Sequence, residues 1–277
     1  MNKVLCLRTC DAQRRGHGGF QWPESGYVEA PDWSPEPCCG RGLHGLLWGE
    51  GEAFHLSAAD DAVWLVVSVE ATDIVDLDGK VKFPRGEVVY CGDRDGAVAY
   101  ILANGGAGKA CAYARAPAGA YGAATAGEGG TATAGYSGTA TAGDYGVATA
   151  GAYGTATAGD YGTATAGYSG TATAGAYGAA TAGDYGTATA GYKGTATAGE
   201  GGTATAGAYG TATAGDKGTA TAGDDGTATA GDDGTVCIRW YDGAAARYRT
   251  AFGYVGEDGI ESNVPYRVEG RGKLVRA

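Results

Sequence analysis

The alternation of apolar and polar residues changes about one hundred residues into the chain. Before that point, residues 63–69 form a continuous apolar run typical of a buried strand, and residues 81–90 contain two shorter β signals. Residues 95–102 are compatible with a short helix. We therefore predict that residues 1–105 fold as a small α+β domain.

Beyond this domain, residues 122–233 repeat every eight positions, fourteen times. The unit is Gly-Thr-Ala-Thr-Ala-Gly followed by two variable residues, and two degraded copies precede it at residues 106–113 and 114–121. Thr-Ala-Thr-Ala alternates with a period of two, which predicts a strand with one residue type on each face. Thr is β-branched and suits a strand surface, whereas Ala suits a thin interior. We attribute the glycines that bound each strand to the backbone angles of tight turns.

The variable pairs indicate how many octads make one coil. Pairs sixteen residues apart form two series, one with Tyr alternating between the two positions and the other with Tyr in a constant position. A coil of two octads explains both series, because each series then occupies one edge of a flat, two-sheet β-solenoid. Since neighbouring coils lie ~4.8 Å apart, the rings can stack. The constant series gives the predicted tyrosine ladder: Tyr145, Tyr161 and Tyr177.

The predicted fold is mostly β, with an octapeptide-repeat β-solenoid at residues 106–233, sixteen residues per coil and two flat sheets. Thr faces outward and Ala inward. Residues 234–277 leave the repeat pattern and introduce bulky apolar residues where the repeats carry Ala. This is expected of a cap that closes the open end of a stack. We expect Ile238 and Trp240 to pack over the last Ala layer.

Composition and charge narrow the classes of function. Glycine occurs 54 times, but Thr, Ala and Tyr recur at fixed positions, which argues against disorder, and no collagen triplet runs through the chain. A net charge of −11 disfavours nucleic acid and anionic membranes as partners. Without an apolar stretch near ~20 residues or a signal-peptide core, we expect a cytoplasmic protein unless a nonstandard route exports it. The odd count of seven cysteines favours free thiols.

Residues 142–149 and 166–173 carry the pattern Ala-Gly-x-x-Gly/Ser-Thr-x-Thr, the first with Val147 in place of the leading Thr. In this pattern the array resembles the repeats of bacterial ice nucleation proteins. The resemblance implies a sixteen-residue-coil β-solenoid whose Thr-x-Thr rows order water. Proteins of that family have far longer arrays and a different, membrane-associated N-terminal domain. Residues 38–45 resemble a small domain found beside such repeats in bacterial and phage proteins of unknown function.

The first functional hypothesis is that the Thr rows bind ice or ordered water without enzymatic activity or a cofactor. Thr-x-Thr spaces its side chains ~6.8 Å apart along a strand and ~4.8 Å apart between coils, and ice faces have repeats of similar size. Octads sixteen residues apart give six uninterrupted rows on one face, whereas Val147 and Ala179 interrupt the other. The candidate binding residues are Thr139, Thr141, Thr155, Thr157, Thr171, Thr173, Thr187, Thr189, Thr203, Thr205, Thr219 and Thr221.

Two alternatives stay open. The solenoid could be a structural spacer or a component of a self-assembling filament, which would make the chain a homo-oligomer. Alternatively, the N-terminal domain could be an enzyme or hold zinc through its cysteines and the histidine of a glycine-flanked turn, although the cysteine spacing is loose. The residues of that zinc hypothesis are Cys6, Cys10, Cys38, Cys39 and His44.

One edge of the predicted solenoid carries a column of acidic residues sixteen positions apart, namely Asp184, Glu200, Asp216 and Asp232. Stacked carboxylates repel each other, so stability alone gives no reason for this column. We favour a charged edge that keeps rods from associating side by side. The alternative is a ladder of divalent cations, which needs converging oxygen ligands.

Overall fold

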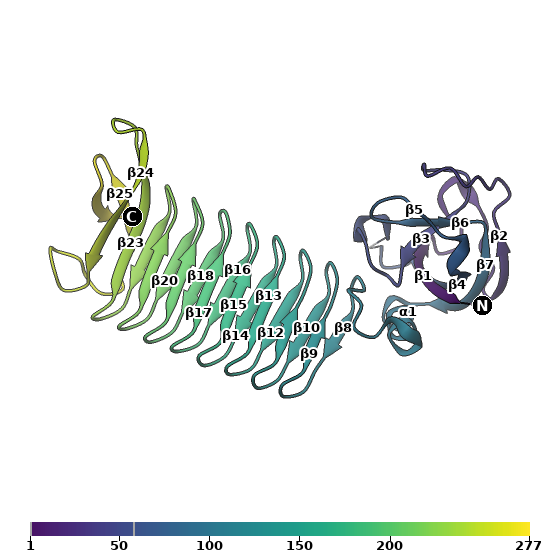
Figure 1. The fold of residues 1–277 in the computed structure, drawn as a ribbon, viewed down its shortest axis with the longest axis horizontal. Coiled ribbons are helices and arrows are strands. Elements are labelled where there is room, and N and C mark those ends of the chain that lie inside the picture. The colour runs from purple at the N-terminus through teal and green to yellow at the C-terminus, as the bar shows by residue number, and fades with distance from the viewer. Residues whose placement is uncertain (1, 58) are drawn as a thin grey trace. The chain divides into compact units, whose positions relative to one another are not determined.

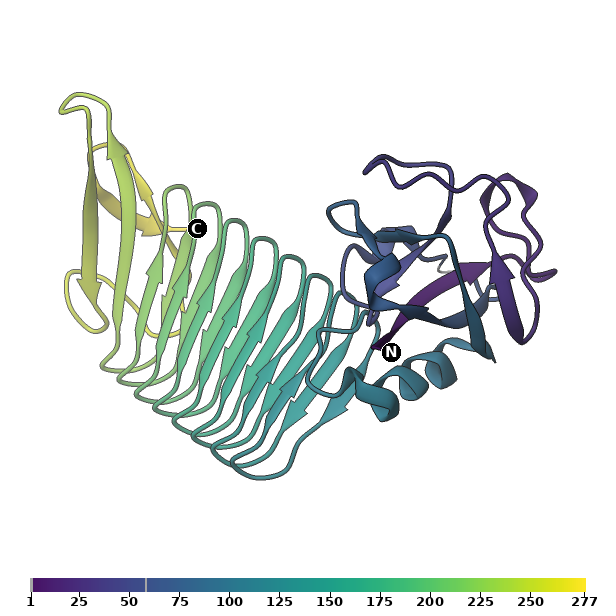
Figure 2. The same cartoon turned by 45° about the vertical axis from the view of Figure 1, so that its right-hand side comes forward.

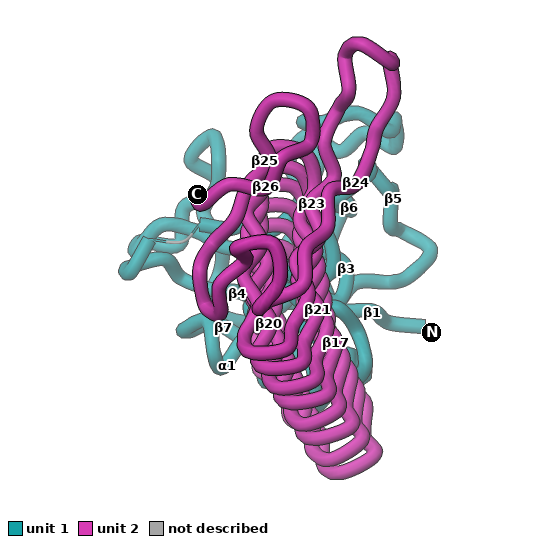
Figure 3. Tube along the Cα trace, turned by 90° about the vertical axis from the view of Figure 1, so that its left-hand side faces the viewer, with its two compact units in different colours: residues 1–114, 125–130 teal, residues 115–124, 131–277 magenta. Residues whose placement is uncertain are grey.

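The computed structural model describes residues 2–57 and 59–277. The chain divides into two compact units, coloured separately in Figure 3. Unit 1 comprises the residues up to Ala114 together with Thr125–Gly130, and unit 2 comprises Arg115–Ala124 and Thr131–Ala277.

Unit 1 contains an antiparallel sheet of seven strands in the order β2-β7-β4-β1-β3-β6-β5. The strands are β1 (Lys3–Cys10), β2 (Gly26–Glu29), β3 (Leu43–Leu47), β4 (Val63–Glu70), β5 (Val75–Asp76), β6 (Val81–Phe83) and β7 (Arg85–Gly92). The helices are α1 (Arg94–Ile101) and the short turns η1 (His17–Gly19), η2 (Ala53–His55), η3 (Ala71–Asp73) and η4 (Leu102–Gly106). The apolar run, the two later β signals and the short helix are thus confirmed.

Local chemistry explains these elements. Strand β4 is almost wholly apolar because it lies inside the sheet, between β7 and β1, and most of its residues are buried. Helix α1 begins after Asp93, whose side chain accepts a 2.7 Å hydrogen bond from the N–H of Gly96, as an N-cap should. The core of unit 1 contains Leu65, Phe83 and Trp22, each at most 1 % exposed.

Unit 2 is a stack of two-strand coils (Figure 1 and Figure 2). The ten-stranded sheet contains β8 (Arg115–Pro117), β10 (Thr131–Ala134), β12 (Val147–Ala150), β14 (Thr163–Ala166), β16 (Ala179–Ala182), β18 (Thr195–Ala198), β20 (Thr211–Ala214), β22 (Thr227–Ala230), β25 (Tyr266–Glu269) and β26 (Lys273–Arg276). The nine-stranded sheet contains β9 (Ala123–Thr125), β11 (Thr139–Thr141), β13 (Thr155–Ala158), β15 (Thr171–Ala174), β17 (Thr187–Ala190), β19 (Thr203–Ala206), β21 (Thr219–Ala222), β23 (Thr235–Asp242) and β24 (Arg247–Tyr254).

Odd and even strands of the repeat belong to different sheets, so one coil takes two octads. Within each sheet the parallel partners lie sixteen residues apart, as in the pairing of Thr171 with Thr187. Figure 3 looks along the stack and shows the coils superposed with a flattened outline. The predicted β-solenoid of sixteen residues per coil is therefore confirmed. Without the antiparallel strands β24 to β26, each sheet contains eight parallel strands. The fourteen regular octads alone would supply seven coils at two octads per coil.

The two faces of each strand are occupied as the alternation predicts. In β15, Ala172 is completely buried and Ala174 is 3 % exposed, whereas Thr171 lies at the surface. The same pattern recurs from coil to coil. Because the interior is filled almost entirely by methyl groups, each residue buries little apolar area. The continuous ladder of backbone hydrogen bonds between coils must therefore supply much of the stability of the array.

The repeat glycines have a different role from the one expected. None of the glycines that bound the octads has a left-handed backbone, which is found instead at the second variable position, as at Tyr161 with φ of 57°. The bounding glycines are required by lack of space. A Cβ on Gly175 would lie 2.7 Å from the backbone nitrogen of Asp160 in the preceding coil, closer than real Cβ atoms approach. The left-handed turn position is thus occupied by Tyr, Ser, Lys or Asp and, at Gly129 and Gly201, by glycine, whereas the bounding glycines determine how closely the coils approach.

The two ends of the array are built from residues that depart from the regular octad. Residues 106–114, all described, contain no strand, so the first degraded octad does not join either sheet, and β8 is the first strand of its sheet. At the other end, Val236 and Ile238 of β23 are buried and pair in register with Ala220 and Ala222 of β21.

The far side of β23 is covered by an antiparallel strand, β24, and β25 with β26 extends the other sheet. Trp240 is only half-buried and lies two residues beyond the last rung between β21 and β23. Its ring packs so closely on Gly272 that a Cβ there would be 2.8 Å away. The predicted packing over the Ala layer therefore fits Ile238, whereas Trp240 packs within the C-terminal extension.

Candidate functional site

The predicted Thr residues form two parallel columns on the outer side of the nine-stranded sheet, which we call the threonine face. One column is defined by the pairing of Thr139, Thr155, Thr171, Thr187, Thr203 and Thr219. The other is defined by the pairing of Thr141, Thr157, Thr173, Thr189, Thr205 and Thr221. The structure thus brings all twelve residues together on one surface in exact register, without assigning them a ligand.

The two columns are not equally accessible. In the first column the side chains from Thr139 to Thr203 are exposed, whereas the second column is half-buried from Thr157 onward. Among the hydrogen bonds of the described residues, none involves the hydroxyl groups of these twelve residues, apart from an interaction of Thr221 with the thiol of Cys237. The remaining hydroxyls are therefore left to water.

The outer side of the ten-stranded sheet, which we call the opposite face, is less regular. Val147, 40 % exposed, and Ala179 replace Thr in its first column. The second column keeps Thr from Thr133 to Thr229. The opposite face therefore has one broken and one unbroken column, and it serves as an internal comparison for the threonine face.

The edge that carries Tyr161 contains the predicted tyrosine ladder. The Tyr145 and Tyr161 rings are parallel within 5° at a centroid distance of 5.0 Å, and Tyr161 and Tyr177 are parallel within 2° at 4.9 Å. These distances equal the spacing between coils, so a constant turn position makes face-to-face stacks. The ladder of Tyr145, Tyr161 and Tyr177 is confirmed.

The edge that carries Tyr153 also has an aromatic column, but of different geometry. Tyr136, Tyr153 and Tyr168 contact each other with interplanar angles of 63° and 72°. The rings alternate between the two turn positions, so successive rings leave the backbone in different directions and meet edge to face. The alternation of ring positions thus accounts for the change from stacked to edge-on packing.

The acidic turn residues form hydrogen bonds that the sequence did not reveal. The side chain of Asp184 accepts a 3.0 Å bond from the backbone N–H of Glu200, and Asp216 accepts a 2.9 Å bond from that of Asp232. Asp144 and Asp160 do the same on the other edge, at 2.8 and 2.7 Å. The expectation that stability gives no reason for an acidic column was therefore wrong. An Asp at the first variable position can thus accept a hydrogen bond from the backbone N–H of the next coil. In the sequence, only the sixteen-residue spacing of these positions could have indicated this bond.

The residues of the zinc hypothesis do not form a metal site. Cys6 and Cys10 are buried, whereas Cys38 and Cys39 are exposed. Burial raises the pKa of the Cys6 and Cys10 thiols, which disfavours the thiolate that zinc requires. Across residues 2–57 and 59–277 no group of three or more His, Cys, Asp or Glu side chains could hold a metal ion. His44 lies within strand β3 and not on a turn, as the flanking glycines had suggested.

Residues 4–99 match a family described as a domain of unknown function (DUF7666). Over 105 residues the chain is 46% identical to an ice nucleation protein of Pseudomonas syringae, and these residues make up 37% of this chain and 9% of the relative. Over 106 residues it is 43% identical to an ice nucleation protein of Xanthomonas campestris pv. translucens, covering 38% and 7% respectively. No solved structure matches the chain.

These matches show an array similar to that of ice nucleation proteins. The matched length is close to that of the octapeptide array, and the chain spans a tenth or less of the length of these relatives. Among the described residues, no helix is both long and apolar enough to cross a bilayer.

Proposed function

We propose that the threonine face binds ice or ordered water. The observation that supports this most directly is the pair of unbroken, in-register Thr columns from Thr139 to Thr221. Each column presents a hydroxyl and a methyl group every ~4.8 Å along the stack, and the columns are ~6.8 Å apart. On a surface of this kind, one layer of water contacts the hydroxyl and the methyl groups at the same time.

The rigidity of the face contributes to such binding. Backbone hydrogen bonds fix each coil to the next, for example between the N–H of Thr171 and the carbonyl of Gly154 at 2.9 Å. Thr is also stiff about its first side-chain torsion. A surface that is already ordered loses little conformational entropy when it binds an ordered ligand.

The size of the face sets the expected activity. Six rows have five spacings of ~4.8 Å, so the face is about 24 Å long. Relatives named ice nucleation proteins are many times longer than this chain. We therefore propose that this chain modifies the growth of existing ice and does not nucleate ice efficiently.

The test compares ice crystals grown in dilute solutions of three proteins. The wild-type chain should produce faceted crystals, whereas Thr171→Lys/Thr187→Lys should lose faceting because two long charged side chains interrupt adjacent rows. The matched control is Thr195→Lys/Thr211→Lys, adjacent rows on the opposite face with the same change in charge. Unshaped ice at millimolar wild-type protein, or equal loss in both variants, would contradict the proposal.

The structural alternative makes a different prediction in the same system. A spacer or filament component has no affinity for ice and should stay in the liquid during slow directional freezing. Transfer of the wild-type chain into the ice, and rejection of the threonine-face variant, would favour ice binding. A sedimentation measurement alongside would test whether the chain is a homo-oligomer.

A further inference from the structure

Unit 1 contains a cavity of about 970 Å³, at the upper end of the usual size for a small-molecule site. Three segments line it: residues 16–20, residues 39–46 and residues 54–56, with Arg8 and Trp22 at its wall. All three histidines of the chain are among the lining residues.

Arg8 is the central charge at this cavity, and the protein does not neutralise it. Its guanidinium lies 3.9 Å from the centre of the Trp22 ring. Its two terminal nitrogens donate to neutral backbone carbonyls, those of His44 at 3.2 Å and Thr9 at 3.3 Å, and its side chain also interacts with the thiol of Cys10, whose pKa is raised by burial. Among the described residues no carboxylate is within ion-pair distance of Arg8. Arg8 is half-buried, and a cation partly removed from water without an anion is costly, so an anionic partner would be favoured.

Three buried nitrogens at this place have no hydrogen-bond partner: Nε of Arg8, Nε1 of Trp22 and Nε2 of His44. Burial and the charge of Lys80 lower the pKa of His44, and its ring hydrogen-bonds the backbone of Gly42, so only the nitrogens of Arg8 and Trp22 are unpaired donors. These two lie together, because a Cβ built on Gly16 would be 2.9 Å from both Nη2 of Arg8 and Nε1 of Trp22. Buried donors are almost always paired in native proteins, so two unpaired ones at one place indicate a missing acceptor.

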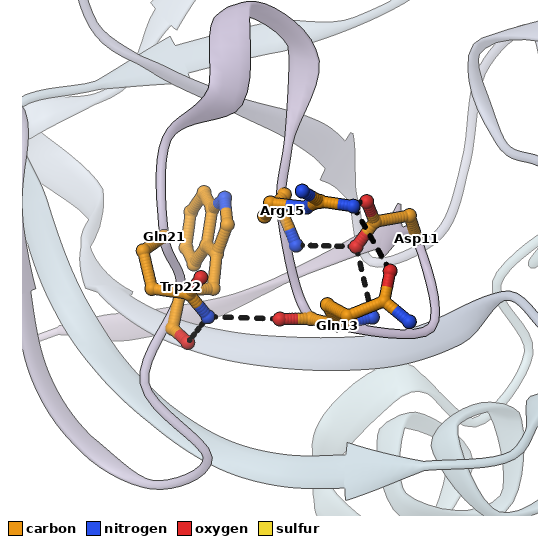
Figure 4. Close-up of polar contacts among 5 residues, drawn as sticks. All are labelled: Asp11, Gln13, Arg15, Gln21 and Trp22. Carbon is orange, nitrogen blue, oxygen red and sulfur yellow. Dashed lines mark hydrogen bonds and ion pairs between the residues drawn. The ribbon is translucent and has the colours of Figure 1, made fainter.

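The nearby carboxylates have other partners, although Asp32 also lines the cavity. Figure 4 shows Asp11 bound by Arg15, with its Oδ2 2.8 Å from the Arg15 Nε and its Oδ1 accepting from the N–H groups of Gln13 and Arg15. Asp32 accepts a hydrogen bond from the N–H of Gly42. The Glu52 carboxylate lies 3.4 Å from the imidazole of His55.

The hairpin in Figure 4 also explains why Trp22 is at the wall. Gln21 donates to the carbonyl oxygens of Gln13 and Trp22, and the hairpin is closed by a bridge between Arg15 and Gln21. Between these residues runs the loop Gly16-His17-Gly18-Gly19, in which Gly18 and Gly19 have left-handed backbones. The loop passes directly over the donor cluster, where Gly16 leaves no room for a side chain.

We propose that this cavity binds a small phosphorylated molecule that also has a planar or apolar part. The unpaired N–H groups of Arg8 and Trp22 suit a phosphate, whose several oxygens can accept from a guanidinium and from a second donor at once. Lys80 adds positive charge at the wall, and Arg41 lies there as well, paired with Glu36. The apolar part packs on Phe54, which is 71 % exposed although it lines the cavity.

Binding requires a small local change. The three unpaired nitrogens are closed to water in the free chain, so the guanidinium must turn from the Trp22 ring toward the cavity to reach a phosphate oxygen. Its present bonds are long and neutral, and a charge-assisted bond to phosphate is stronger. The environment of the Trp22 indole must therefore change on binding.

The experiment titrates the full chain with three probes: adenosine 5′-monophosphate, inorganic phosphate and adenosine. Indole N–H signals in nuclear magnetic resonance spectra report binding, and Trp22→Phe assigns the Trp22 signal. We expect adenosine monophosphate to bind most tightly, phosphate weakly and adenosine least. The Trp22 signal should move, whereas those of Trp64 and Trp240, outside the lining, should not.

Two variants locate the contacts. Arg8→Gln should weaken binding of the nucleotide at least about tenfold, because it removes charged hydrogen bonds. Arg85→Gln, an exposed arginine paired with Asp73, is the matched control and should bind like the wild type. If Arg8→Gln does not fold, Phe54→Ala at an exposed position decides the question, because it should weaken binding of the nucleotide but not of phosphate. No shift of the Trp22 signal with either phosphate-containing probe at millimolar concentration would overturn the proposal, as would unchanged affinity in folded Arg8→Gln.

Discussion

Replacing a single methylene hydrogen of Gly175 by a methyl group should destabilise the solenoid. In Gly175→Ala the new Cβ would lie 2.2 Å from Oδ1 of Asp160, 2.7 Å from its backbone nitrogen and 2.8 Å from the carbonyl carbon of Gly159. Two of these atoms are backbone, so the coils themselves must move apart. The carboxylate of the displaced Asp160 also accepts a hydrogen bond from the N–H of Ala176 in the next coil, and this bond would be disturbed.

The magnitude follows from two opposing effects. Overpacking in a tight interior costs ~1–3 kcal/mol. Against this, Gly→Ala restricts the unfolded chain and stabilises by ~0.4–1 kcal/mol where the backbone is compatible, as it is here. With the middle of each range, the net loss is ~1.3 kcal/mol. At ~2–4 °C per kcal/mol for a protein of this size, the melting temperature should fall by ~3–5 °C.

Two further variants test the reasoning. Gly201→Ala places a methyl group at a left-handed turn position, where other coils carry Tyr, Ser, Lys or Asp, and its close contact is with the movable ring of Tyr185. It should therefore cost less than Gly175→Ala. Gly243→Ala meets no atom within 4 Å and should be neutral or slightly stabilising. Thermal melts followed by circular dichroism measure all three. If Gly201→Ala proved more damaging than Gly175→Ala, glycine would be needed for its backbone angles and the reasoning would be refuted.

Two other predictions concern the acidic turns and the C-terminal extension. Millimolar calcium should not raise the melting temperature beyond sodium at equal ionic strength, because Asp184 and Asp216 already accept backbone N–H groups and Glu200 lies 3.6 Å from Lys217; a large, calcium-specific rise would contradict this. Deletion of residues 234–277 removes β23 to β26 and exposes the edges of β21 and β22, so the shortened chain should associate in sedimentation experiments. A truncated chain that stays monomeric at high concentration would show that these edges need no cover.

The solenoid could be predicted well because the sequence that forms it repeats with a fixed period. Alternation with period two assigns Thr and Ala to opposite faces, and the variable pairs recurring every sixteen residues assign the coil and its register. The turn chemistry was not predictable in the same way. The second variable position tolerates Tyr, Ser, Lys and Asp, so its left-handed backbone leaves no residue preference to recognise.

The cavity of unit 1 escaped prediction for a different reason. Arg8, Trp22 and His44 come from separate elements and meet only after the antiparallel sheet has formed. His44 looked like a turn residue because glycines flank it, yet a Cβ on Gly45 would lie 2.9 Å from the carbonyl oxygen of Leu7, so that glycine reflects close strand packing. The role of the twelve Thr residues in binding stays a prediction, as do the domain boundaries at residues 105 and 233.

The sixteen-residue coil constrains how such an array can lengthen or shorten during evolution. Loss of two consecutive octads removes one whole coil, and every later strand keeps its sheet, its face and its tyrosine edge. Loss of a single octad moves all later strands to the other sheet. The Thr rows then continue into the interrupted face, and β23 with its antiparallel neighbour pairs with a strand of the wrong sheet. Slippage of the coding repeat should therefore be tolerated in steps of sixteen residues and eliminated in steps of eight, which makes whole coils the heritable unit of length.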